Sequence, residues 1–224
     1  LFLDHPDDLR LGEAAFPHRL CSFSGGRLYI TARKLPGGRS AGGKAAATLI
    51  SWPSLYFSGY NPELFYLKNE CGAPVNDTFD YHILPVFKEY ASGESVEACI
   101  SSYQNRDPGN ALRVDKAISL LEQKERNLPV KTSDFIMDNF RSEKLFHTFN
   151  HPASKGLLHV AGQMLDSLGI SNDLPTTLRF EALASTTCPI TSIVREHLSL
   201  RFEDSASVLI KGVEQSLLFD VRSY

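Results

Sequence analysis

A short strand that leads through a proline corner into a long helix constrains the fold of this chain more than any other feature. The apolar segment 144–149 predicts a strand, and the segment 154–169 repeats its apolar residues with helical spacing until Gly169 ends it. Pro152 lies between the two segments, and proline is favoured in the first turn of a helix, where no backbone donor is needed. The sequence therefore predicts a strand, a corner and a helix in direct succession.

The rest of the chain predicts a helix-rich mixed α/β domain. Apolar β-type runs predict strands in 27–35 and 47–62. Ser133 is expected to cap the helix that follows it. Because helices dominate with a few strands between them, we expect a single domain, 1–224, around a small, mainly parallel sheet. The further predicted helices are 80–90, 95–103, 110–127, 134–141, 192–198 and 208–219.

Composition excludes several classes of protein. The chain has 224 residues and a formal net charge of −3, which argues against a broad nucleic-acid surface. No apolar run reaches the roughly 18 residues of a membrane span. The cysteines are far apart and form no CxxC pair, which argues against a zinc ribbon and a dense disulfide scaffold; they are Cys21, Cys71, Cys99 and Cys188. We therefore expect a cytoplasmic protein with reduced cysteines, no metal and no signal peptide.

A glycine-rich basic segment, GGRSAGGKA at 37–45, almost matches a phosphate-binding loop. Gly38, Gly43 and Lys44 have the required spacing. Ala45, however, stands where a serine or threonine would hold magnesium. The segment is interpreted as a solvated loop or as a basic loop that meets an anionic ligand, rather than as a nucleotide site.

Two histidines are candidate catalytic bases. His82 has Asp77 and Asp80 close by, and a carboxylate beside an imidazole can fix its tautomer and raise its basicity. The alternative is a surface histidine at a helix start. His151 follows Asn150 at the end of the predicted strand, where open α/β sheets bind ligands. The alternative there is that Asn150 caps the helix and His151 packs.

The start of the helix at 154–169 has the composition of an anion site. The small side chain of Ser154 leaves room for a ligand to approach the free amides, and Lys155 adds positive charge. Arg141 is a further candidate for pairing with phosphate. Asn150 would point into the same crevice. These four residues are the predicted cofactor contacts.

Other conspicuous residues have structural interpretations. His147 lies in the middle of a predicted strand and His159 lies inside a predicted helix, so both are interpreted as structural. An aromatic loop in 47–62 has side chains that can stack on sugars. Core packing is the preferred interpretation for them; they are Trp52, Tyr56, Phe57 and Tyr60.

Several segments together resemble the WcbI family of capsule-polysaccharide biosynthesis enzymes. The similarity follows the order 51–67, 80–95 and 119–165, and is less sharp in 188–200. Its recognisable points are an aromatic-Gly-Tyr-x-Pro loop, a Tyr-His pair, and Asn-His-Pro before a helix. The resemblance implies an α/β fold distantly like SGNH hydrolases, bound coenzyme A or acyl-coenzyme A, and a role in acyl transfer to polysaccharide.

One departure from that family concerns the nucleophile. Its members usually open with a strand and a Gly-Asn-Cys-Gln turn that supplies a candidate cysteine, and this chain has no such tetrapeptide. Cys71 in NECGAP and Cys21 in LCSFSGG stand in different contexts. We therefore expect either that the natural N-terminal segment is missing or that this member has no cysteine step.

The resemblance and the candidate residues favour an acyltransferase that moves an acyl group from coenzyme A to a sugar hydroxyl. His82 or His151 would take the proton of the hydroxyl, and the amides near Ser154 would hold phosphate or a developing oxyanion. Two alternatives remain open. A sulfotransferase with an adenylate-type sulfate donor would need the same base and helix start, and a non-catalytic carbohydrate-binding or assembly module would use the aromatic loop. The expected partner is a sugar or polysaccharide.

Overall fold

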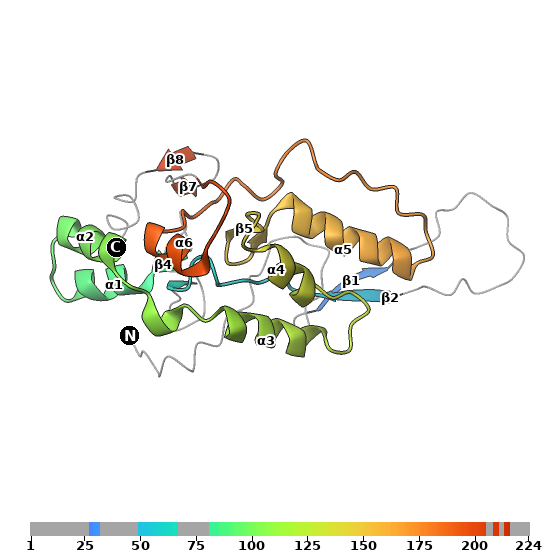
Figure 1. Cartoon of the computed structure of the whole chain (residues 1–224), viewed down its shortest axis with the longest axis horizontal. Helices are drawn as coiled ribbons and strands as arrows, with labels where there is room; N and C mark the ends of the chain where they lie inside the picture. The colour runs from blue at the N-terminus through green and yellow to red at the C-terminus, as the bar shows by residue number, and fades with distance from the viewer. Residues whose placement is uncertain (1–26, 32–48, 67–80, 205–207, 211–212, 216–224) are drawn as a thin grey trace, which may run out of the picture.

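The computed structural model describes residues 27–31, 49–66, 81–204, 208–210 and 213–215 (Figure 1). Its strands are β1 (Arg27–Thr31), β2 (Leu49–Pro53), β3 (Leu64–Tyr66), β4 (Tyr81–Ile83), β5 (Phe146–Thr148), β6 (His151–Pro152), β7 (Val208–Ile210) and β8 (Val213–Gln215). Its helices are α1 (Leu84–Ala91), α2 (Val96–Asn105), α3 (Val114–Glu125), α4 (Ser133–Asn139), α5 (Ser154–Ser167) and α6 (Ser192–Leu198), with a 3-10 turn, η2 (Gly109–Ala111).

Every strand pairing in the described residues is antiparallel, so the prediction of a mainly parallel sheet is wrong. The pairs are β1–β2, β3–β4, β5–β6 and β7–β8. Each strand pairs with its neighbour in the chain, which needs no crossover helix. The β7–β8 pair also replaces part of the helix predicted at 208–219. The likeness to SGNH hydrolases stays a prediction.

The predicted helices in the middle of the chain are confirmed as α2, α3, α4 and α6. The helix predicted at 80–90 begins later, at Leu84, because Tyr81–Ile83 form β4. The glycine-rich segment 37–45 lies outside the described residues, as do Asp77 and Asp80. None of the described helices is long and apolar enough to cross a membrane.

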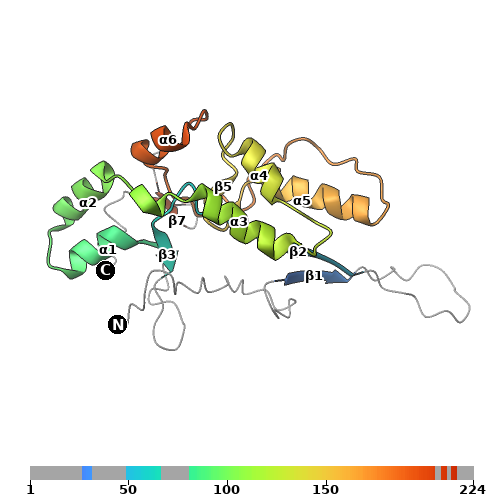
Figure 2. The ribbon, with the colours of Figure 1, turned by 60° about the horizontal axis from the view of Figure 1, so that its bottom comes forward.

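Helices α3 and α5 both contact β2 and together cover one side of it. Figure 2 shows β1 and β2 along one face of the molecule, with α3, α4 and α5 on the other side of β2. Helices α1 and α2 pack against each other at the end of the molecule that lies opposite α5 (Figure 1). The segments that carry the candidate site lie between these two ends.

An aromatic core joins the loop after β2 to the region around α4 and β5. The ring of Phe57 lies 5.0 Å from Tyr60, 5.6 Å from Phe140 and 5.7 Å from Phe146. All four side chains are buried, which confirms core packing for Phe57 and Tyr60. The Tyr60 hydroxyl donates to the Phe140 carbonyl at 2.6 Å, so the core also fixes the turn after α4.

Helix α4 begins against a buried carboxylate. Ser133, predicted as its cap, is instead its first residue, and the side chain of the capping position, Thr132, makes no cap bond. Glu125, from the end of α3, accepts hydrogen bonds from the amides of Thr132 (2.7 Å) and Ser133 (3.1 Å) and from both hydroxyls. Glu125 therefore satisfies the free amides at the start of α4 from another helix.

Helix α5 confirms the long helix predicted at 154–169 after the proline corner. It begins at Ser154, and Pro152 belongs to β6, so the placement of this proline in the first helical turn is wrong. The helix ends as predicted. Gly169 has a φ of 65°, a left-handed conformation that glycine adopts freely after a helix.

Candidate functional site

Four polar side chains meet between the β3–β4 pair and the β5–β6 corner. Asn150 donates from Nδ2 to the Tyr66 hydroxyl at 2.7 Å, and its Oδ1 accepts from the Tyr81 hydroxyl at 2.8 Å. The Tyr81 hydroxyl also lies 3.1 Å from Nε2 of His151 and 3.4 Å from the Tyr66 hydroxyl. We call these residues, Tyr66, Tyr81, Asn150 and His151, the tyrosine–histidine cluster.

The turn 149–150 between β5 and β6 brings two members of the cluster together. Thr148 pairs opposite His151 across this turn. The Thr148 hydroxyl donates to Asn150 Oδ1 at 3.1 Å, which orients the amide side chain. The corner therefore presents Asn150 and His151 to the same tyrosine.

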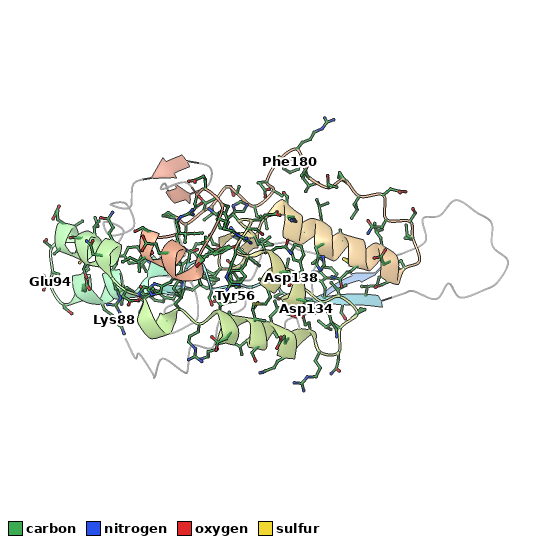
Figure 3. The ribbon with its side chains drawn as sticks, viewed as in Figure 1. Tyr56, Lys88, Glu94, Asp134, Asp138 and Phe180 are labelled. Atoms are coloured by element: carbon green, nitrogen blue, oxygen red, sulfur yellow. The ribbon has the colours of Figure 1, made fainter. Side chains whose placement is uncertain are left out.

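The buried ring of Phe149 packs against the tyrosines of the cluster. Its side chain is 1% exposed, and its ring lies 5.0 Å from Tyr56, 5.0 Å from Tyr66 and 5.3 Å from Tyr81. Its carbonyl accepts from the amide of Phe57 at 2.7 Å. Figure 3 shows Tyr56 near the middle of the view, and the burial of Phe149 ties the site to the interior.

Burial keeps the titratable groups of the cluster neutral near pH 7. It lowers the pKa of His151; the Thr186 carbonyl, 3.4 Å from Nδ1, raises that pKa in part, and the neighbouring His147 lowers it further. Burial also raises the pKa of Tyr81, against the hydrogen bonds that lower it. The cluster thus pairs a neutral imidazole with a neutral phenol, an arrangement that can accept and pass a proton.

The predicted anion site at the start of α5 is occupied by a carboxylate of the chain itself. The Ser154 amide donates to Glu181 at 2.7 Å, and the Ser154 hydroxyl donates to the Phe180 carbonyl at 3.1 Å. Glu181 also lies 3.2 Å from Nε2 of His147. Phe180 is 70% exposed on the segment after α5 (Figure 3). The first turn of α5 is therefore able to hold an anion, and Glu181 occupies that position here.

The two predicted cations lie near the turn after α4. Lys155 forms an ion pair with Glu143, and its Nζ lies 3.4 Å from Asn139 Oδ1. The side chains of Lys155 and Glu143 are 41% and 46% exposed. Arg141 is exposed, with its guanidinium 4.3 Å from the Phe140 ring centroid. The predicted cofactor contacts therefore separate into Asn150 in the tyrosine–histidine cluster and three residues around the start of α5 and the turn after α4.

His82 lies apart from the tyrosine–histidine cluster. It follows Tyr81 in β4, and successive side chains of a strand point to opposite faces. Its ring is 1% exposed and lies 6.0 Å from the Phe65 ring. Burial lowers the pKa of His82 to about 4. The structure thus places only one of the two candidate bases, His151, in the cluster.

The sequence identified Asn150 and His151 but missed the groups that contact them. Tyr81 and Tyr66 approach from segments 70 and 84 residues earlier in the chain. Glu181 reaches the start of α5 from 27 residues later. Tyr81 was noted only as half of a Tyr-His pair, and no local pattern showed which of the two side chains faces His151.

Fold and site together define a protein of helices and small antiparallel sheets with a polar cluster beside the start of a long helix. A family model described as polysaccharide biosynthesis enzyme WcbI matches residues 41–173, more than half of the chain. The chain belongs to the WcbI family of polysaccharide biosynthesis enzymes. The resemblance noted in the sequence is thereby confirmed.

A solved structure shares this fold. It is described as WcbI, a novel polysaccharide biosynthesis enzyme, in its native form without a disulfide bond between coenzyme A and one of its cysteines. It matches with a TM-score of 0.63 and 16% sequence identity over 76% of this chain. The match covers 58% of the other chain, so this chain spans a little over half of that protein. No curated protein matches the chain.

Proposed function

We propose that this chain binds coenzyme A and transfers an acetyl or other acyl group from it to a sugar hydroxyl during polysaccharide biosynthesis in the cytoplasm. Membership of the WcbI family supports the pathway. The description of the solved WcbI structure, which refers to coenzyme A, supports the donor. Acyl-coenzyme A supplies an activated thioester, and the residues of this chain bind it and manage the proton of the acceptor.

The observation that carries the proposal is the contact between Tyr81 and His151 within the tyrosine–histidine cluster. An acceptor hydroxyl must lose its proton as it attacks an acyl carbon, and general-base help typically contributes about 10²–10⁴-fold to the rate. His151 is the proposed base because its lowered pKa leaves the imidazole unprotonated at neutral pH. His82 remains the second candidate, although a pKa of about 4 makes it a weaker base.

The donors around the start of α5 fit the phosphates of coenzyme A. The Ser154 amide already holds a carboxylate, which shows that this position accepts negative charge. Lys155 and Arg141 add two cations that water can reach. In our proposal phosphate replaces Glu181 at Ser154 and Glu143 at Lys155. Asn150, the remaining predicted contact, would then lie at the end of the ligand nearest the base.

The test combines binding and turnover. Coenzyme A or acetyl-coenzyme A at millimolar concentration should raise the melting temperature, because a ligand that binds only the folded state stabilises it. With an acceptor sugar, His151→Ala should lower turnover by about 10²-fold or more and retain the melting shift. An unchanged melting temperature with both compounds, or stabilisation only by an adenylate-type sulfate donor, would overturn the proposal.

A further inference from the structure

We propose that Tyr81 is a second catalytic residue, which passes the proton of the acceptor hydroxyl to His151. The inference rests on the proposed acyl transfer and deepens it. It says that the base acts through a phenol and does not touch the acceptor itself. Some atoms of the cluster can donate a hydrogen bond and others can only accept one, and this decides the path of the proton.

Both ring nitrogens of His151 lie against protein atoms. Nδ1 is 3.4 Å from the carbonyl oxygen of Thr186, and Nε2 is 3.1 Å from the hydroxyl of Tyr81. A carbonyl oxygen only accepts, so the neutral ring carries its proton on Nδ1 and keeps its lone pair on Nε2. The basic nitrogen therefore faces Tyr81, and a proton reaches it through that hydroxyl.

The Tyr81 hydroxyl has one proton, and in the described part of the chain Asn150 and His151 both offer an acceptor within reach of it. Asn150 Oδ1 lies 2.8 Å from the hydroxyl and His151 Nε2 lies 3.1 Å from it. When His151 is neutral, the phenol can turn the proton that it donates to Asn150 toward Nε2 instead. When His151 is protonated, Nε2 becomes a donor to the phenolic oxygen, and the phenolic proton turns to Asn150. Both protonation states of the base thus keep a complete set of hydrogen bonds.

Asn150 is fixed in the orientation that this exchange requires. Its Nδ2 donates to the Tyr66 hydroxyl at 2.7 Å, and its Oδ1 accepts from Thr148 at 3.1 Å. The amide oxygen is therefore held toward Tyr81. Tyr66, Thr148 and Asn150 act as positioning residues in this scheme, since each acts through Tyr81.

The acyl group and the proton move in one balanced step. The acceptor O–H bond breaks as its oxygen forms the new ester bond to the acyl carbon. The phenolic oxygen of Tyr81 takes that proton while its own proton moves to Nε2 of His151. The C–S bond of the thioester breaks, its electron pair leaves with the thiolate, and the proton on His151 returns along the same path to thiolate or water. The raised pKa of Tyr81 disfavours a free tyrosinate, so the two proton movements occur together.

Kinetics of two single variants and their combination test the relay. Tyr81→Phe should lower kcat by about 10²-fold or more, as His151→Ala does, and should retain the melting shift with coenzyme A. Because the two residues act in series, the double variant should be no slower than the slower single variant. Tyr56→Phe, the same change in a tyrosine that packs on Phe149, is the control and should keep its turnover. Near-normal turnover in Tyr81→Phe beside a strong loss in His151→Ala would overturn the relay.

A second measurement needs no activity. In ¹⁵N spectra of histidine-labelled protein, His151 should be protonated at Nδ1 with Nε2 accepting a hydrogen bond. Tyr81→Phe should move the Nε2 resonance toward that of an unbonded nitrogen. If that shift occurs while the wild-type protein transfers no acyl group, the proposed function fails and the proton path remains supported. An Nε2 resonance that Tyr81→Phe leaves unchanged overturns the relay, whether or not the protein is an acyltransferase.

Discussion

Helices α4 and α5 both begin against a glutamate from another segment, but the two glutamates lie in different surroundings. Glu125 is 2% exposed and accepts four hydrogen bonds from Thr132 and Ser133. Glu181 has a side chain that is 44% exposed and meets Ser154 and His147. In α4 a buried glutamate thus accepts hydrogen bonds from the amides at the helix start, and in α5 a glutamate at the surface does so.

The exposure of the two glutamates decides which helix start can exchange its anion. Removing a buried carboxylate leaves several donors without water or a partner, so Glu125 is a fixed part of the fold. Water reaches the Glu181 carboxylate, whose side chain is 44% exposed, but Ser154 is 3% exposed, so its amide needs a replacement acceptor such as a phosphate when Glu181 leaves. In our proposal the start of α5 therefore binds a ligand, whereas the start of α4 serves stability. Four predictions test this contrast.

Glu125→Ala should produce the largest change, a loss of roughly 3 kcal/mol in the free energy of unfolding. The substitution leaves the amides and hydroxyls of Thr132 and Ser133 buried without their acceptor. Denaturant titration measures the effect. Glu122→Ala, on the exposed side of the same helix, is the control and should stay within about 0.5 kcal/mol of wild type. Equal losses in the two variants would contradict a structural role specific to Glu125.

Lys155→Glu should weaken coenzyme A binding by about 1–3 kcal/mol, the scale of a charge-assisted contact. Folding should barely change, because the ion pair with Glu143 is exposed. Calorimetric titration of coenzyme A gives the affinity. Lys124→Glu makes the same charge change on α3 and should leave it unchanged. An unaltered affinity in a folded Lys155→Glu protein would place the phosphates elsewhere.

Glu181→Gln should strengthen coenzyme A binding by about 1 kcal/mol, or about fivefold in affinity. The amide keeps the shape of the side chain but removes the negative charge that competes with phosphate at Ser154. The same titration measures it. Weaker binding in this variant would mean that Glu181 assists the ligand and does not compete with it.

Acid should release the surface cap with a small effect on stability, below about 1 kcal/mol. Partial burial raises the pKa of Glu181, but the bonds from Ser154 and His147 outweigh it and bring the pKa below its usual range. Its stabilisation is therefore present above the ordinary glutamate pKa of about 4.3 and is lost as the pH falls through the lower folded value. Unfolding measured across this range should be flatter in Glu181→Gln. A steeper profile in the variant would reject this source of acid sensitivity.

Sequence reasoning succeeded where the structure is local. The strand, the corner and the helix over 144–169 follow from apolar spacing and a terminal glycine, so α5 appeared almost as predicted. The prediction of a mainly parallel sheet was wrong because strand pairing depends on contacts between segments. Periodicity does not reveal whether neighbouring strands pair directly or are joined by a crossover. The predicted cap of α4 was wrong for the same reason. Glu125 reaches the start of α4 from the end of α3 and accepts the hydrogen bonds there, including the one from the Ser133 hydroxyl.

The candidate site likewise has residues that local sequence predicts and residues that only tertiary packing brings in. Asn150 and His151 could be found from one corner of the chain. Tyr66 and Tyr81 could not, because only the packing of β3–β4 against Phe149 brings their hydroxyls to that corner. Whether phosphate displaces Glu181 likewise depends on a segment that joins α5 from later in the chain.

The short turn at 149–150 has a consequence for insertions and deletions. It holds Thr148 opposite His151, and an irregularity between Phe146 and Thr148 already takes up one residue of β5, so a further change of length would shift the face that His151 presents. One added or removed residue would turn His151 away from Tyr81 even if every functional side chain were kept. At this corner the length of the chain is therefore as specific as its chemistry, and divergent relatives should be aligned on this spacing before their residues are compared.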